Sequence, residues 1–219
     1  MAATQPILAQ IRSYWEELRA GRLMPLRSEI DPREMSPFLE VCFVLERQEP
    51  GDIRFRLAGM GVNDLMGMEV RGMQLRSLIA PEGRAQFSQQ IDTLFTEPEI
   101  QVYKLMAEAG NSPPLTANML LLPLKSDDGE ADRAIGCLTT DGIVGIPPRR
   151  FNVSELQRTS LVTGLSQINA VITPKPSPLH PAGFAEKAQP FEQAAREQVQ
   201  MPDTNEMMQT SVPYLKVVK

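Results

Sequence analysis

Apolar and polar residues follow one another along this chain with two different periods, which predict its strands and helices. At residues 53–57, three apolar residues alternate with two arginines, a pattern typical of a strand with one buried face. Residues 38–46 are denser in apolar and β-branched types and favour a central strand. In all, five segments predict strands: 38–46, 53–57, 100–107, 115–124 and 134–141.

The second period places apolar residues three or four positions apart and predicts helices. Near the N-terminus, Ile11, Trp15 and Leu18 fall on one face of an amphipathic helix. Two interpretations of this helix stay open: it caps the core of its own domain, or it pairs with a copy of itself. Residues 81–98 predict a longer helix.

A short helix is expected directly after the strand at 53–57. Gly59 ends that strand, since glycine tolerates backbone angles that β-branched residues do not. Val62, Leu65 and Met66 form one helical face, and Gly67 is placed as the C-terminal stop. A compact corner of this kind is suited to wall one side of a small cavity above a sheet.

The order of these elements predicts an α+β fold, with a five-stranded antiparallel sheet and helices against one face. Residues 1–22 form the N-terminal amphipathic helix, and residues 23–146 form the domain. For residues 147–173 a helix is considered, but helix and extended chain both stay open, because an apolar face competes with many threonines and serines. The Pro-rich tail at 174–219 is expected to be largely disordered.

Charge and composition narrow the class of function. With a formal net charge of -5, the chain lacks the broad basic surface that nucleic-acid binding needs, so no nucleic-acid partner is expected. No apolar run reaches the length of a membrane span, and the N-terminus has no continuous apolar stretch of a secretory signal. We therefore expect a cytoplasmic protein. Cys42 and Cys137 lie in apolar strand-like runs and are expected to be buried thiols, with a disulfide between neighbouring strands as the alternative.

Several spaced groups of residues resemble a known family: Trp15-x-x-Leu18-Arg19-x-Gly21, Pro25-x-Arg27-Ser28-Glu29-Ile30-Asp31-Pro32, Phe55-Arg56-Leu57-Ala58-Gly59, Leu65-Met66-Gly67 and Arg71-Gly72. Together with the order of elements, they resemble a PAS domain and, more narrowly, a bacterial family of small stand-alone PAS-like proteins. The similarity covers roughly residues 7–141. It implies a PAS-like sheet and a sensory or protein-contact role. It implies no particular ligand, because PAS domains bind haem, flavin, small acids or no ligand.

The placement of histidine and cysteine disfavours several cofactors. His180 is the single histidine and lies in the Pro-rich tail, so a His-ligated haem, a multi-histidine metal site and a Ser-His-Asp triad are not expected. A flavin–cysteine photosensor needs a cysteine on the short helices beside its ligand, and residues 60–80 contain none. A chromophore bound covalently to cysteine is disfavoured for the same reason, and the identity of any cofactor stays unknown.

Six residues are candidates for the wall of a ligand pocket under the sheet: Met60, Asn63, Leu65, Met66, Leu75 and Leu78. Methionine and leucine line adaptable apolar pockets, but they also fill cores, and core filling is the simpler interpretation. Asn63 is as well suited to brace the corner as to meet a ligand.

The function expected from these features is a non-enzymatic signalling module that acts by protein–protein contacts. It would form a homodimer or bind a separate signalling protein, with Ile11, Trp15 and Leu18 as interface candidates. The alternative is a sensor that holds a small metabolite or noncovalent cofactor under the sheet. Carboxylates occur without informative spacing, so an enzyme is not expected.

Overall fold

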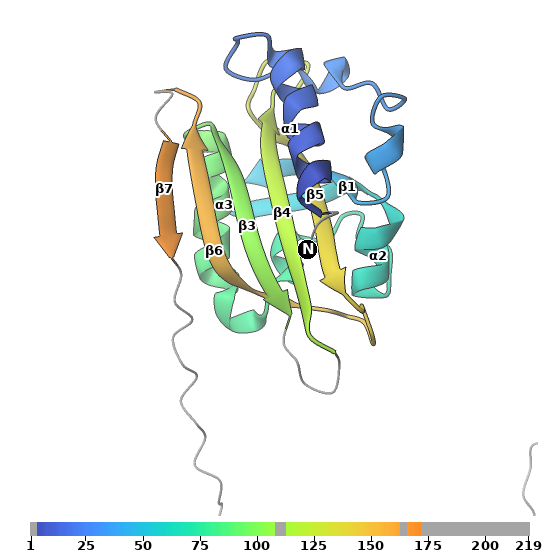
Figure 1. Ribbon diagram of the computed structural model, residues 1–219. Helices are drawn as coiled ribbons and strands as arrows, with labels where there is room; N and C mark the ends of the chain where they lie inside the picture. Colours follow the sequence, from blue (N-terminus) through green and yellow to red (C-terminus); the bar gives the residue numbers. More distant parts are fainter. Residues whose placement is uncertain (1–3, 108–112, 163–165, 172–219) are drawn as a thin grey trace, which may run out of the picture. The chain divides into compact units, whose positions relative to one another are not determined.

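The computed structural model describes residues 4–107, 113–162 and 166–171 (Figure 1). The helices are α1 (Thr4–Arg19), α2 (Met60–Met66) and α3 (Arg84–Thr96), with 3-10 turns η1 (Arg27–Glu29), η2 (Ser36–Phe38), η3 (Leu75–Leu78) and η4 (Pro81–Gly83). The strands are β1 (Cys42–Glu49), β2 (Asp52–Ala58), β3 (Glu99–Ala107), β4 (Leu115–Leu124), β5 (Arg133–Gly142), β6 (Phe151–Ser160) and β7 (Ser166–Val171). In this part of the chain no helix is long and apolar enough to cross a membrane.

All strands join one antiparallel sheet in the order β2-β1-β5-β4-β3-β6-β7. The five predicted strands and their antiparallel pairing are confirmed, but the predicted count of five is wrong. The sheet gains β6 and β7 from the segment for which a helix was considered. Because β6 pairs along β3 from Glu99 to Ala107, its backbone satisfies an edge that a helix would leave open. The sheet thus continues past residue 146, where the domain was expected to end.

The central strands are buried on both faces. In β4, Met119 and Leu121 belong to one hydrophobic cluster, while Leu120, Leu122 and Leu124 belong to a second cluster on the opposite face. This explains the apolar run at residues 119–124 of β4, since a strand covered on both sides has no solvent face. The expectation of helices on one face is therefore corrected, because α1 covers the other face (Figure 1).

Helix α1 covers the outer face of the sheet, the face that carries Leu120 and Cys137. Ile11 and Trp15 are 1% and 0% exposed in this second cluster. The Trp15 indole Nε1 donates a hydrogen bond to the carbonyl oxygen of Pro123 at 3.0 Å. Of the two interpretations of this helix, the structure supports the one in which it caps its own domain.

The inner face of the sheet is filled by α2, α3 and aromatic side chains. Phe43 and Phe55 meet edge to face at a centroid distance of 5.3 Å. The Phe43 ring lies over Gly136, where an added Cβ atom would come within 2.1 Å of the ring. Glycine at this position lets the ring occupy the space under the sheet.

Candidate functional site

The corner between β2 and α2 forms as the sequence predicts, and hydrogen bonds hold it against the chain at the start of β1. Gly67 ends α2 in the left-handed conformation at φ 68°. The Gly59 N–H donates to the carbonyl of Cys42 at 2.8 Å, and the Gly61 N–H donates to that of Glu40 at 3.0 Å. A Cβ atom on Gly59 would lie 2.0 Å from the Leu39 carbonyl oxygen, so only glycine permits this close approach.

Beside this corner lies an open groove on the outer face of β1 and β2, with a volume of about 420 Å³. Its lining is almost wholly apolar, and Arg27 and Glu40 are its charged members. The residues that line it are Arg27, Ile30, Pro32, Met35, Leu39, Glu40, Cys42, Phe43, Val44, Leu57, Ala58, Gly59, Met60 and Ile135. We call it the apolar groove.

Three large side chains of the apolar groove face solvent instead of the core. Leu39, Leu57 and Met60 are 48%, 54% and 68% exposed, whereas Ile30, Met35 and other lining residues are buried. Single exposed apolar residues are ordinary, but a gathering of them in one concave surface makes the groove a candidate binding site.

Leu57 reaches this surface because β2 contains a β-bulge. Val44 pairs with Leu57, but the next residue of β1, Leu45, pairs with Phe55, so Arg56 is an extra residue. Side chains alternate between faces, and one extra residue reverses the alternation beyond it. Phe55 therefore points into the core, and Leu57 turns outward into the apolar groove.

A pair of thiols lies at the edge of the apolar groove. Cys42 on β1 is directly opposite Cys137 on β5, and both are free and buried. The expectation of buried reduced thiols is confirmed. A hydrogen bond with the Cys42 thiol and burial both raise the pKa of Cys137, so Cys137 is a neutral thiol at ordinary pH.

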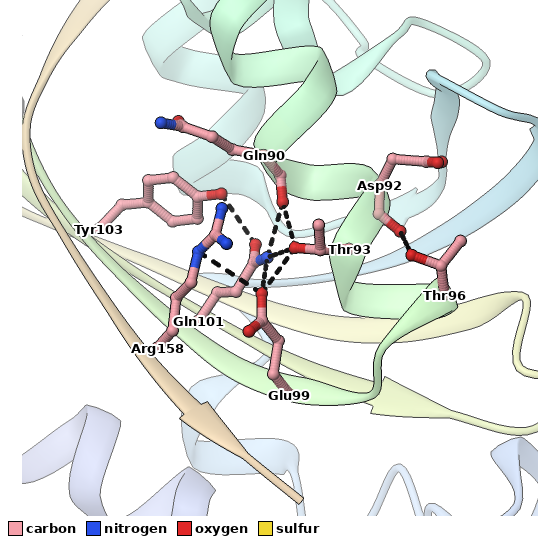
Figure 2. Close-up of polar contacts among 8 residues, drawn as sticks. All are labelled: Gln90, Asp92, Thr93, Thr96, Glu99, Gln101, Tyr103 and Arg158. Atoms are coloured by element: carbon pink, nitrogen blue, oxygen red, sulfur yellow. Dashed lines mark hydrogen bonds and ion pairs between the residues drawn. The ribbon is translucent and has the colours of Figure 1, made fainter. Parts of the chain in front are cut away.

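A second concentration of polar side chains lies between α3, β3 and β6, and we call it the polar cluster (Figure 2). Glu99, Gln101 and Tyr103 point to the same face of β3, towards α3. The Glu99 carboxylate accepts hydrogen bonds from Thr93 Oγ1 at 2.6 Å and from Gln101 Nε2 at 2.7 Å. Arg158 on β6 adds an ion pair at 3.6 Å.

Most polar groups of this cluster satisfy one another, whereas Gln90 Oε1 and Arg158 Nε are buried without a hydrogen-bond partner. The Tyr103 hydroxyl donates to Gln101 Oε1 at 2.8 Å, and Gln101 Nε2 donates to the Gln90 carbonyl at 2.8 Å (Figure 2). Burial raises the pKa of Tyr103 above its ordinary value of 10.0, which keeps the hydroxyl protonated as a donor. The cluster therefore ties α3 to the sheet through Glu99 and Gln101, which are buried, while Arg158 at its edge is partly exposed.

The family model of the PAS domain matches residues 3–139. This chain belongs to the PAS domain family. No curated protein matches the chain.

Solved structures similar to this PAS domain are light-oxygen-voltage (LOV) proteins. The light-state Aureochrome1 LOV domain has a TM-score of 0.38 and 14% identity, covering 50% of this chain and 88% of that one. The LOV protein of Rhodobacter sphaeroides has a TM-score of 0.37 and 19% identity, covering 52% and 69%. An RNA-binding LOV receptor has a TM-score of 0.39 and 18% identity, covering 49% and 32%.

The six pocket candidates are separated in this PAS domain. Leu65, Met66, Leu75 and Leu78 are packed in the inner core, which is the simpler interpretation of their composition. Met60 lines the apolar groove. The pocket expected under the sheet is thus corrected to a groove on the opposite face, because Phe43 and its neighbours fill the inner side.

Asn63 braces the corner of this PAS domain, as one of its two interpretations predicts. Its side-chain Oδ1 accepts a hydrogen bond from the Val70 N–H at 3.0 Å. It also lines a small hollow of about 90 Å³ with Leu57, Glu69 and Arg71.

The interface candidates lie on the face of α1 that packs against the sheet and not on a free surface. Ile11 and Trp15 are buried against the domain's own sheet, and Leu18 is partly buried beside them. The residues that sequence reasoning missed are Leu39 and Leu57. The alternation at 53–57 assigns Leu57 to the buried face, and only the pairing of β1 with β2 reveals the bulge that moves it.

Proposed function

We propose that this PAS domain is a non-enzymatic signalling module that binds a segment of a separate partner protein in the apolar groove. The observation that carries the proposal is the gathering of Leu39, Leu57 and Met60, all exposed, in one concave apolar surface. Burying such side chains against a partner removes apolar area from water, which stabilises the complex by roughly 25 cal/mol for each Å² buried.

The other features of the domain support a function in protein–protein contact over an enzymatic function. The buried carboxylate of Glu99 is engaged by Thr93, Gln101 and Arg158 and lies out of reach of a substrate. The Cys137 thiol is protonated, buried and therefore a poor nucleophile. Self-association through Ile11 and Trp15 would require α1 to leave the sheet, which favours a separate partner over a homodimer at this helix.

A second candidate is a sensor for a small metabolite or noncovalent cofactor held in the same groove. Its volume of about 420 Å³ favours this candidate, because small-molecule sites span roughly 300–1,000 Å³. The two candidates share a surface and differ in what is found on it.

Site-directed photo-crosslinking tests the proposal in cells that make the protein naturally. A photoreactive phenylalanine analogue replaces Leu39 in the full chain, and the cross-linked peptides are identified by mass spectrometry. The expected result is a cross-link to one partner segment that disappears when Met60→Glu is added. Met68 is the matched control position, since it is 55% exposed but does not line the apolar groove.

The outcomes separate the candidates. Equal cross-linking from positions 39 and 68, or cross-linking insensitive to Met60→Glu, contradicts the proposal. Native mass spectrometry of the same full chain tests the second candidate. A bound mass that Met60→Glu removes favours the metabolite sensor over the partner segment.

A further inference from the structure

Next to the apolar groove lies a polar hollow of about 430 Å³, which we call the arginine hollow. It is lined by Gln48, Arg54, Phe55, Arg56, Glu69, Arg71 and Gly72. This lining contains three arginines and one carboxylate, that of Glu69. The hollow is therefore suited to an anion, although the whole chain carries a net negative charge.

The backbone positions these arginines beside the edge of β2. The Phe55 N–H donates to the Met73 carbonyl at 3.0 Å, and the Gly72 N–H donates to the Phe55 carbonyl at 2.7 Å. Arg54 Nη1 also donates to the Gly72 carbonyl at 3.0 Å. Gly72 has a φ of +81°, which favours glycine and lets the chain turn here and place Arg71 at the hollow.

Two of the three arginines have partners of their own, and the third is free for a ligand. Arg54 pairs with Asp52 at 3.0 Å, and Arg56 pairs with Glu46 at 2.5 Å. Arg71 is exposed, and no described residue forms an ion pair with it. A paired guanidinium keeps donors for further contacts, because it carries five N–H groups. Arg71 is thus the main anion-binding group, with Arg56 beside it.

The arginine hollow and the apolar groove form one continuous surface. The small hollow of about 90 Å³ lies between them and is lined by Leu57, Ala58, Asn63, Glu69 and Arg71. It shares Leu57 and Ala58 with the apolar groove, and Glu69 and Arg71 with the arginine hollow. The bulge at Arg56 creates this continuity, since it turns Leu57 outward directly after the two arginines.

We propose that the partner segment carries an aspartate or glutamate near its apolar residues. Its apolar side chains fill the groove at Leu39, Leu57 and Met60, while its carboxylate binds Arg71 in the arginine hollow. A carboxylate accepts two parallel hydrogen bonds from a guanidinium, which fixes the orientation of the segment. This inference rests on the proposed function and adds the charge of the partner to it.

A peptide selection on the full chain tests the inference. Random short peptides displayed on phage are selected against the wild-type protein. The selected peptides are then synthesised with fluorescent labels, and their affinities are measured by anisotropy. Four variants are compared: Arg71→Ala, Leu57→Glu, Met68→Glu and Arg150→Ala. Arg150 is the matched control for Arg71, because it is exposed and lines none of the three hollows described above.

We expect selected peptides that combine apolar residues with at least one aspartate or glutamate. Arg71→Ala weakens their binding about three- to fivefold, as for an exposed ion pair, and Arg150→Ala leaves it unchanged. Replacing the acidic residue by its amide has the same effect on the wild type and none on Arg71→Ala. High salt weakens wild-type binding more than binding to Arg71→Ala, because salt screens the ion pair.

Each failure has a distinct form. Peptides that lack acidic residues, or that bind Arg71→Ala as tightly as wild type, overturn the inference. If Leu57→Glu still abolishes their binding while Met68→Glu does not, the proposed function stands. A selection whose peptides bind Leu57→Glu and wild type equally overturns both.

Discussion

The apolar groove and the polar cluster are opposites in both chemistry and exposure. The groove carries apolar side chains that face solvent, whereas in the cluster Glu99, Gln101 and Tyr103 are buried between α3 and the sheet. In the cluster, Glu99, Gln101 and Tyr103 form hydrogen bonds within the chain, so the cluster contributes to the stability of the fold. In the groove the apolar side chains have no such cover, so the groove is where another molecule is expected.

The largest expected effect comes from uncovering a closed part of the outer face. Trp15→Ala removes a fully buried indole and its hydrogen bond to Pro123, which extends the uncovered area towards β4. We expect a loss of about 3–5 kcal/mol in the free energy of unfolding, measured by urea denaturation. Leu23→Ala, at a partly exposed position, serves as the control. An unchanged unfolding free energy together with a loss of self-association would instead assign Trp15 to a dimer interface.

Breaking the polar cluster comes next. Glu99→Ala leaves Gln101 and Arg158 without their carboxylate, and we expect a loss of about 2–4 kcal/mol in the unfolding free energy. Glu97→Ala is the matched control, because this exposed neighbour forms no ion pair in the described structure. We expect its change to stay within about 0.5 kcal/mol in the same titration. Similar losses for both variants would remove the distinction between cluster and surface.

Tyr103→Phe sharpens the comparison through pH. At neutral pH the change leaves Gln101 Oε1 without its donor and costs about 0.5–1.5 kcal/mol. Burial raises the pKa of Tyr103 above 10.0, so its contribution to stability is complete below that pH. It is lost as pH rises towards the folded-state value.

The measurement is the urea midpoint at a series of alkaline pH values. Above pH 10 the wild type should lose stability more steeply than Tyr103→Phe. Tyr14→Phe is the control, since Tyr14 is less buried and its pKa is also raised, chiefly by burial. Parallel pH profiles for the wild type and Tyr103→Phe would contradict the burial of the Tyr103 hydroxyl in the cluster.

The smallest effect on stability is expected in the apolar groove. Met60→Ser changes a side chain that is 68% exposed, and the unfolding free energy should stay within about 0.5 kcal/mol of wild type. The same variant should lose binding of the partner segment, as measured by anisotropy with the selected peptides. A loss of about 2 kcal/mol or more would show that Met60 supports the core.

The sequence predicted the parts of this fold that depend on local period. The alternation before Gly59, the helical spacing after it and the stop at Gly67 all predicted the β2–α2 corner correctly. The five strands from β1 to β5 were predicted for the same reason. Segment 151–160 was ambiguous, since its strand structure depends on pairing with β3, a partner that is distant in sequence.

The site itself was less predictable, because it depends on contacts between distant segments. Met60 was identified for a pocket, but the face of the sheet on which the groove lies was not. Gly59 was assigned to end a strand, whereas its tightest constraint is the carbonyl of Leu39. The alternation at 53–57 places the arginines at positions 54 and 56 opposite the buried face, but their grouping with Arg71 required the turn at Gly72.

The bulge in β2 changes, within a single strand, which residues point to the core and which point to solvent. Before Arg56, the side chains of the odd-numbered residues point into the core, and after it they point to solvent. The exposure of the Leu57 side chain is thus set by the number of residues that precede it in the strand and not by its residue type. Two relatives with equal hydrophobicity along this strand, differing by one inserted position, would present different surfaces to their partners.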